Sequence, residues 1–290
     1  MNFHQECLIC HSADLKYLSK YSQNYLVKCN NCGFIFASKI PTTEELTQYY
    51  NNYNRQAYIS PITIMRYNEL LDIFERYRKT SNILDIGCGV GYFLEEAKKR
   101  NWNVYGTEYS DQAVNICTEK RLNVKKGTTS SINFDKEFFD IITSFEVIEH
   151  INNPLEEIQS IYHILRKDGI FYLTTPNINS ITRLILKDKW NVINYPEHLC
   201  YYSPKTLHYL LKKNNFQKIS LKTTGISISR FRNSKHTSNN PLIAPNSDDE
   251  IIRVKSENNK IFKLLIKITN HILSLLAIGD NIKALYQKNK

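Results

Sequence analysis

The stretch that most constrains the fold lies at residues 82–93, which read NILDIGCGVGYF. An apolar run at 83–86 is followed by glycines at three alternate positions, Gly87, Gly89 and Gly91, and then by the start of a helical pattern. A short buried strand, a tight glycine turn and a helix start are the parts of a nucleotide-binding βα unit. The glycines allow positive φ angles and a close approach of a ligand to the main chain. The sequence therefore predicts an α/β domain with a ligand at this turn.

The spacing of this turn narrows the class of ligand. Tyr92 stands where a dinucleotide-binding fingerprint would carry its third glycine, and no Gly-Lys-Ser/Thr of a P-loop follows. Residues 102–105 are a second strand candidate, and Glu108 lies just past its end. That is about 20 residues after the turn, where a carboxylate accepts hydrogen bonds from ribose hydroxyls. A ribose without a pyrophosphate fits an adenosyl ligand.

The turn and the carboxylates on either side of it resemble the cofactor motifs of class I S-adenosylmethionine-dependent methyltransferases. Taken alone, the glycine turn would also fit a structural turn in another α/β domain. Relatives carry an acidic residue near the adenine, where this chain has Gly127-Thr128-Thr129. The resemblance implies S-adenosylmethionine (SAM) as cofactor. The implied cofactor-binding residues are Asp85, Gly87, Cys88, Gly89, Gly91, Tyr92, Phe93, Glu108, Tyr109, Thr128, Phe145 and Glu146.

Strand and helix patterns alternate through the rest of this region. Further strands are expected at 123–126, 138–145, 170–175 and 216–224, with helices between them. Such alternation predicts a parallel, doubly wound, Rossmann-like sheet that binds ligands at the carboxyl ends of its strands. The family resemblance adds a seventh strand, expected at 281–287, which inserts antiparallel beside the fifth.

Four cysteines near the N-terminus form a second motif. Cys7, Cys10, Cys29 and Cys32 read as C-x2-C, eighteen residues and C-x2-C, the spacing of a zinc site. Four thiolates close a tetrahedron and leave no position for water, so the predicted Zn²⁺ is structural. Two disulfides or four free thiols are the alternatives. We expect about one zinc per chain.

The motifs divide the chain into three predicted regions. Residues 1–40 form the zinc ribbon, 41–80 a helical region that is either a plain linker or a lid over the cofactor, and 81–290 the methyltransferase domain with a helical insertion at about 230–279. A Pro-Thr-Thr-Glu-Glu-Leu segment at 41–46 and a Tyr-Tyr pair at 49–50 follow the ribbon. Together they resemble the N-terminal part of bacterial methyltransferases of sugar and surface-polysaccharide biosynthesis.

Methyl transfer to a hydroxyl needs a base, for which histidine suits neutral pH. Tyr195, Glu197 and His198 form a Tyr-x-Glu-His segment that resembles the acid/base cluster of sugar methyltransferases with a similar ribbon. His198 is the first candidate and His150 the second; for either, the alternative is a histidine held by backbone groups. The favoured function is methylation of a sugar hydroxyl on a free sugar, a nucleotide-linked sugar or a glycan.

Other functions and partners stay open at this stage. The formal charge of +10 permits RNA, but the ribbon carries few basic residues, so nucleic acid is the less favoured partner. A quinone or other small-molecule O-methyltransferase and a non-catalytic binding protein are further alternatives. The chain has no signal-peptide pattern, which predicts a cytoplasmic protein. An apolar helix at 261–278 is expected to pack in the core, in a homodimer or against a membrane surface.

Overall fold

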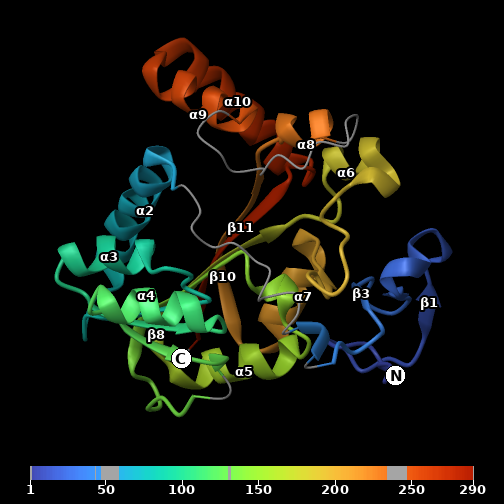
Figure 1. The fold of residues 1–290 in the computed structure, drawn as a ribbon, viewed down its shortest axis with the longest axis horizontal. Coiled ribbons are helices and arrows are strands. Elements are labelled where there is room, and N and C mark those ends of the chain that lie inside the picture. Colours follow the sequence, from blue (N-terminus) through green and yellow to red (C-terminus); the bar gives the residue numbers. More distant parts are fainter. Residues whose placement is uncertain (1, 43, 47–58, 130–131, 234–246, 290) are drawn as a thin grey trace.

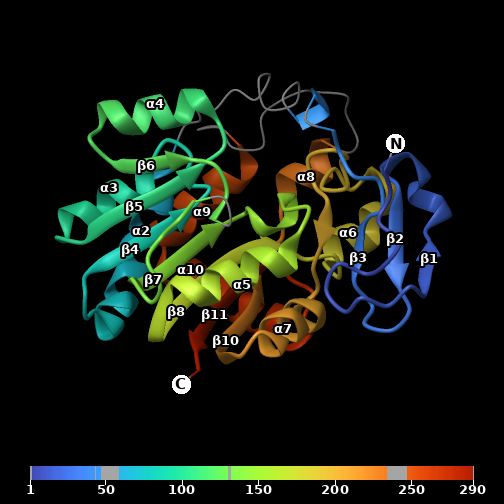
Figure 2. The same cartoon turned by 90° about the horizontal axis from the view of Figure 1, so that it is seen from below.

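The computed structural model describes residues 2–42, 44–46, 59–129, 132–233 and 247–289. A seven-stranded sheet runs through the centre of the molecule, and a smaller four-stranded sheet lies at the N-terminal side (Figures 1 and 2). The segment at 47–58, which belongs to the expected linker or lid, and the polar segment at 234–246 lie outside the described residues.

The central sheet confirms the predicted fold class. Its order is β10-β11-β8-β7-β4-β5-β6, and β11 is antiparallel to both of its neighbours. The strand between β8 and β10 is thus the last one in the chain, as the family resemblance implied. The strands are β4 (Asn82–Ile86), β5 (Asn103–Glu108), β6 (Asn123–Lys126), β7 (Phe139–Phe145), β8 (Leu165–Pro176), β10 (Phe216–Thr224) and β11 (Asn281–Lys288).

Two strand boundaries differ from the sequence prediction by more than one residue. Glu108 is the last residue of β5 instead of a loop residue, because β5 stays paired with β6 up to Lys126. The strand expected at 170–175 begins earlier, because β8 starts at Leu165. Leu165 pairs with Phe139, and a register shift follows before the regular ladder starts. Pairing with a neighbouring strand therefore sets the start of β8.

Helices cover both faces of the central sheet. Leu71, Phe74 and Phe93 of α2 and α3 share one core cluster with Ile83 of β4. The other cluster includes residues of α5 and α7, packed against the opposite face. The helices are α2 (Pro61–Phe74), α3 (Tyr92–Lys99), α4 (Asp111–Glu119), α5 (Pro154–Ile164), α6 (Ile181–Leu186), α7 (Pro204–Lys213), α8 (Ile228–Asn233), α9 (Asp248–Asn258) and α10 (Lys260–Leu275).

The N-terminal ribbon is joined to the main domain by shared backbone pairing. Its sheet has the order β1-β2-β3-β9, with β1 (Leu15–Tyr17), β2 (Leu26–Cys29) and β3 (Ile35–Ala37) from the ribbon. The fourth strand, β9 (Cys200–Tyr201), comes from the main domain and pairs with β3. The ribbon's Phe34 also packs against Tyr202. The sequence did not predict β1 or β9, because strands of two or three residues carry almost no periodicity.

The described residues of the insertion between β10 and β11 form three helices. Of these, α10 corresponds to the predicted apolar helix, whereas α8 and α9 were not expected. The buried Ser60 at the start of α2 donates a 2.5 Å hydrogen bond to Glu250 of α9. Within the described ranges, none of the helices is both long and apolar enough to traverse a lipid bilayer.

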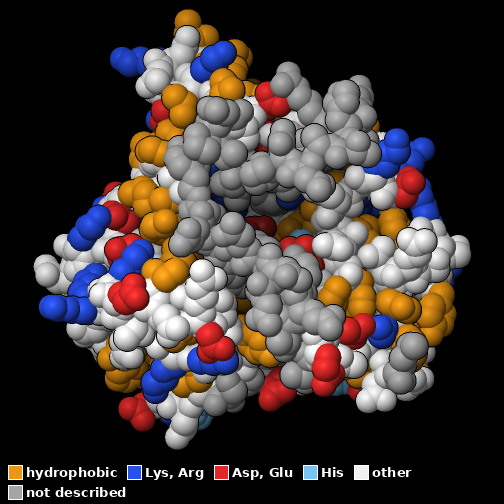
Figure 3. Space-filling model, viewed as in Figure 1, with side chains coloured by type: hydrophobic (Ala, Val, Ile, Leu, Met, Phe, Trp, Pro, Cys, Tyr) orange, Lys and Arg blue, Asp and Glu red, His pale blue; other side chains and the backbone are white. Residues whose placement is uncertain are grey.

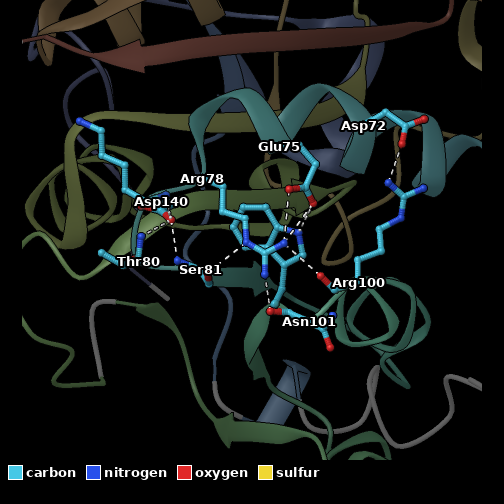
Figure 4. Close-up of polar contacts among 10 residues, drawn as sticks. Asp72, Glu75, Arg78, Thr80, Ser81, Arg100, Asn101 and Asp140 are labelled. Carbon is cyan, nitrogen blue, oxygen red and sulfur yellow. Dashed lines mark hydrogen bonds and ion pairs between the residues drawn. The ribbon is translucent and has the colours of Figure 1, made fainter.

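The amino edge of the sheet is fastened by a buried acid (Figure 4). Asp140, in β7, accepts hydrogen bonds from the backbone N–H groups of Lys79, Thr80 and Ser81 at 2.7–2.8 Å. Its other carboxylate oxygen pairs with the Arg166 guanidinium. This cluster lies at the strand ends opposite to the glycine turn, and it fixes the entry of the chain into β4.

Candidate functional site

A cavity of about 650 Å³ opens where β4, β5 and β7 end. Its walls include the glycine turn, the end of β5, the loop after β7 and the loop before β9. Among the residues implied as cofactor-binding, all except Gly91 line it. Those that line it are Asp85, Gly87, Cys88, Gly89, Tyr92, Phe93, Glu108, Tyr109, Thr128, Phe145 and Glu146.

The glycine turn leaves room for a ligand at its centre. Gly89 has φ of +55°, and a Cβ atom built there would meet nothing within 4 Å. Gly91 has a different role, since it has φ of +84° as the N-cap of α3, and a Cβ there would lie 2.4 Å from Leu122. Only the first of these two positions therefore belongs to the ligand cradle.

Glu108 is held rigidly beside the turn. One carboxylate oxygen accepts the Gly89 N–H at 2.9 Å, and the other accepts the N–H groups of Tyr109 and Ser110 at 2.8 and 2.9 Å. The side chain is buried yet lines the cavity. This geometry suits an acceptor of ribose hydroxyls, because three backbone N–H groups fix the carboxylate in place before a ligand arrives.

Asp85 is a second buried acid at the cavity. Burial, with a smaller contribution from the charge of Glu108, raises the pKa of its carboxyl to about 8. Thr143 donates a 2.7 Å hydrogen bond to it, which acts in the opposite direction. A ligand with a positive charge would compensate two such acids, and SAM carries both an ammonium and a sulfonium. The acids and the open space at Gly89 therefore fit SAM.

Three aromatic rings form a wall of the cavity. Tyr67 of α2, Phe93 of α3 and Phe145 of β7 contact one another with centroid distances of 5.1–5.3 Å. Burial raises the pKa of the Tyr67 phenol well above its usual range, so its hydroxyl stays neutral. These rings exclude water from one side of the site. Tyr67 was not among the residues implied as cofactor-binding, because nothing in its sequence spacing distinguishes a cavity residue from a core residue.

His150 lies at the cavity with a defined tautomer. Its Nδ1 atom lies 2.7 Å from the carbonyl oxygen of Glu197. A carbonyl only accepts hydrogen bonds, so Nδ1 carries the proton and the lone pair of the neutral ring is on Nε2. Such a histidine can take a proton from a hydroxyl. Glu197 also lines the cavity, and its carboxylate accepts a 2.8 Å hydrogen bond from Asn194.

The other two residues of the Tyr-x-Glu-His segment lie behind this site. His198 donates from Nδ1 to the Val192 carbonyl at 2.6 Å, and its ring packs on His150 with a centroid distance of 4.7 Å. Burial lowers its pKa, so the ring is neutral at pH 7. Tyr195 points toward the N-terminal region, where its hydroxyl donates to Glu45 at 3.2 Å. Of these two histidines, His150 is the one that lines the cavity, although the sequence placed His198 first.

Glu149 is a buried carboxyl that sequence reasoning did not select. It accepts a 2.9 Å hydrogen bond from Thr175 and lies 3.8 Å from Nε2 of His150. Burial, reinforced by the nearby Glu146, raises its pKa well above the usual range. The sequence signal that could have identified Glu149 is its place next to His150, in the segment after the fourth predicted strand.

The four N-terminal cysteines converge as predicted. The Sγ atoms of Cys7 and Cys32, and those of Cys10 and Cys29, are 3.5 Å apart, and all four lie within 4.8 Å of one another. Disulfide sulfurs would be about 2.05 Å apart. The edge of a zinc–thiolate tetrahedron is about 3.8 Å. The arrangement thus fits one Zn²⁺ and does not fit two disulfides.

Two equivalent turns present these sulfurs. Cys7 N–H donates to the Ser12 carbonyl and Cys29 N–H to the Phe34 carbonyl, both at 2.9 Å. The turns are related in sequence and in hydrogen bonding, as expected for a four-thiolate ribbon.

Comparison with known proteins agrees with this geometry. An Archaeoglobus fulgidus SAM-dependent methyltransferase of known structure superposes with a TM-score of 0.53 at 20% identity, covering 85% of this chain and all of the other, which shows a shared fold. The ubiquinone biosynthesis O-methyltransferase of Actinobacillus pleuropneumoniae is 35% identical over 106 residues, 33% of this chain and 45% of that protein. Its Pelagibacter ubique counterpart is 27% identical over 178 residues, 57% and 72% of the two chains.

The alignment with the Actinobacillus pleuropneumoniae protein spans less than half of that protein's length. A family model covers more of this chain, since the model for the methyltransferase domain matches residues 54–221, from the region before α2 through most of β10. On the matched sequence, the seven-stranded sheet and the cavity at the glycine turn, the chain belongs to the methyltransferase domain family.

Proposed function

We propose that this protein is a SAM-dependent methyltransferase that methylates a hydroxyl group, with a phenolic ring of the quinone-precursor type as the favoured acceptor. The observation that carries the proposal is His150, whose Nδ1 is fixed by the Glu197 carbonyl at a cavity that also contains Asp85 and Glu108. A hydroxyl must lose its proton as it is methylated, so a positioned base at the cavity suits this acceptor.

The cavity residues divide the work of binding and proton transfer. Glu108 would hold the ribose hydroxyls of SAM, the glycine turn would approach it closely, and Asp85 would face its positive charge. Bound there, SAM would supply an electrophilic methyl group. His150 takes the proton that the acceptor hydroxyl loses, and its ring is kept in position by Glu197 and by the ring of His198. The aromatic wall keeps water away from the acceptor.

Two observations favour a phenolic acceptor. The rings of Tyr67, Phe93 and Phe145 offer an apolar surface of the kind that binds a flat ring. The second observation is that several relatives are named ubiquinone biosynthesis O-methyltransferases. The alignment with the Actinobacillus pleuropneumoniae protein spans 45% of that protein's length.

A sugar hydroxyl is the second candidate. Polar residues of the loop after β7 and of α5 line the rim of the cavity, and they can hydrogen-bond a polyol. They are Asn152, Asn153, Glu156 and Glu157. The same base, His150, would serve this acceptor. The sequence resemblance to sugar methyltransferases also supports this acceptor. However, Tyr195, which is part of that resemblance, points toward the N-terminal region, where its hydroxyl donates to Glu45.

The test is methyl transfer from labelled SAM into an extract separated into lipid-soluble, carbohydrate and RNA fractions. Label in a lipid-soluble phenol supports the favoured acceptor, and label in carbohydrate supports the second candidate. Label in RNA alone would overturn both. Tight SAM binding with no transfer to any fraction would identify a non-catalytic binding protein instead.

The cysteine cluster serves a structural purpose in this proposal. Its four sulfurs would hold Zn²⁺ in a closed shell that leaves no position for a reacting water or substrate. The ribbon stabilised in this way pairs through β3 with β9, directly after the segment that carries Glu197 and His198. Zinc would therefore help to hold the loop that orients the base.

A further inference from the structure

The helix α10 exposes an apolar stripe to solvent. Ile261 and Leu275, near its two ends, are each 73% exposed. The exposed apolar residues of the stripe are Ile261, Leu264, Leu265, Ile268, Ile272 and Leu275. At 100° per residue, these positions fall on one side of the helix and form a continuous face.

This stripe is distinct from the face that α10 uses for packing. Leu273 is buried, and its carbonyl accepts a 2.8 Å hydrogen bond from Thr223 of β10. Phe262 and Ile266 are half-buried on the same inward side. An ordinary surface helix has one apolar face, turned to the core, and a polar opposite face. This helix has a second apolar face, which the fold does not bury within the described residues.

Positive charge borders the stripe. Lys260, Lys263 and Lys267 are exposed on the side of the helix next to Leu264, and Lys263 pairs with Glu257 of α9 at 2.6 Å. The sequence of α10, KIFKLLIKITNHILSL, contains no acidic residue. Figure 3 shows hydrophobic and basic side chains gathered on the projecting part of the molecule that Figure 1 identifies as α9 and α10.

A second exposed apolar pair lies near the end of this helix. Leu184 and Ile185 of α6 are more than half exposed. The N–H of Ile181, at the start of α6, donates to the carbonyl of Ile278, just after α10, at 2.8 Å. The apolar surface of α6 is thus anchored to the same part of the fold.

We infer that α10 lies in the interface of a lipid bilayer with anionic head groups. Its stripe would enter the acyl region, while the lysines would extend to the lipid phosphates. A second copy of the chain is the competing occupant. Pairing two stripes would bring Lys260 and Lys267 of both copies together, with no acid on α10 to compensate them, so charge complementarity favours the anionic lipid. The inference is independent of the acceptor, because lipid binding is measured without any methyl transfer.

The experiment is co-sedimentation of the full chain with vesicles of phosphatidylcholine and phosphatidylglycerol, compared with vesicles of phosphatidylcholine alone. We expect binding to the anionic vesicles, weakening as salt rises. Leu264→Gln/Ile268→Gln/Ile272→Gln should reduce the vesicle affinity by about tenfold or more. The matched control, Ile73→Gln/Ile219→Gln, replaces exposed isoleucines of α2 and β10 and should bind like the wild type.

A second pair of variants tests the charge. Lys260→Glu/Lys267→Glu should abolish the preference for anionic vesicles, whereas Lys16→Glu/Lys28→Glu, with the same change of charge on exposed ribbon positions, should preserve it. Failure of the wild type to bind either vesicle, or equal binding by the stripe variant, would overturn the inference. A wild-type dimer that the stripe variant converts to a monomer would identify a second copy as the occupant. If the triple variant has a lowered melting temperature, the vesicle affinity of the single variant Ile261→Gln is measured in its place.

Discussion

The Nδ1 atom of His150 donates a 2.7 Å hydrogen bond to the backbone carbonyl of Glu197, across 47 positions of sequence. This bond sets both the orientation and the tautomer of the ring at the cavity. Any side chain at position 197 would supply the same carbonyl, so the orientation of the base depends on the path of the loop rather than on the carboxylate.

Replacing the proposed base should abolish turnover. His150→Ala is expected to lower kcat by at least about 100-fold, because a positioned base contributes roughly that much or more to proton transfer. SAM binding should be retained, since Glu108 and Asp85 are untouched. Labelled methyl transfer and equilibrium binding measure the two quantities. The control is His208→Ala, which removes a histidine of α7 that is hydrogen-bonded to Tyr286 of β11. A fully active His150→Ala enzyme would refute the assignment, and loss of activity only in His198→Ala would restore the order expected from the sequence.

Binding of SAM should release a proton at pH 7. Burial raises the pKa of Asp85 to about 8, so its carboxyl is mostly neutral at pH 7. A cationic ligand favours the ionised form and lowers that pKa, so the proton leaves as the ligand binds. Affinity should rise with pH up to about 8 and then level off. Calorimetry at pH 7 in two buffers of different ionisation enthalpy detects the release. Asp85→Asn should weaken binding and remove this buffer dependence; an unchanged dependence in that variant would exclude Asp85 as the source.

Removing the metal should destabilise the ribbon. Purified protein is expected to hold about one zinc per chain, because four thiolates form a single closed site. Cys10→Ser should lose the metal and lower the melting temperature by about 5 °C or more. Elemental mass spectrometry and thermal unfolding measure these effects. Cys200→Ser, which changes a cysteine of the main domain that donates to the Ile151 carbonyl, should retain zinc. A metal-free wild type would contradict the zinc site.

Two acids at the amino edge of the sheet should differ strongly in their effect on stability (Figure 4). Asp140 is fully buried, accepts three backbone N–H groups and pairs with Arg166. Asp140→Asn should therefore lower the free energy of unfolding by about 3–5 kcal/mol. The carboxylate of Asp72 pairs with Arg100 but is 69% exposed, so Asp72→Asn should cost less than about 1 kcal/mol. Urea unfolding of the two variants makes the comparison. Equal losses of unfolding free energy in the two variants would contradict the expected contribution of the buried Asp140 carboxylate.

Local sequence determined the cofactor half of the site because its signals are short-range. The turn at Gly87–Gly91, the acid at position 108 and the cysteine pairs each lie within one strand–turn–helix unit or one tight turn. Their chemistry follows from residue type and spacing. Short-range signals also determined β6 and β10, whose boundaries match the prediction. The helices α4 and α7 likewise begin directly after the serine N-caps Ser110 and Ser203.

Tertiary structure decided the arrangement of the half of the site that is proposed to meet the acceptor. The segment Tyr195–His198 has the residue types of an acid/base cluster, but its three side chains point to different places. Tyr195 reaches Glu45, Glu197 reaches the cavity, and His198 packs behind His150. This divergence arises because the segment runs between the ribbon sheet and the cavity, and contacts from both sides fix its side chains. Neither set of contacts has a sequence period.

The same physical reason explains β9 and the helix α10. Two residues become a strand because β3 of the ribbon lies beside them, and that pairing is a long-range event. In α10, the sequence determined an apolar helix, since helical periodicity is local. Which of its apolar residues meet α9 and β10, and which are left facing solvent, depends on how the assembled sheet receives the helix. Local chemistry thus specified the elements and the cofactor motifs, whereas packing between distant segments specified the position of His150, the aromatic wall of the cavity and the exposed stripe.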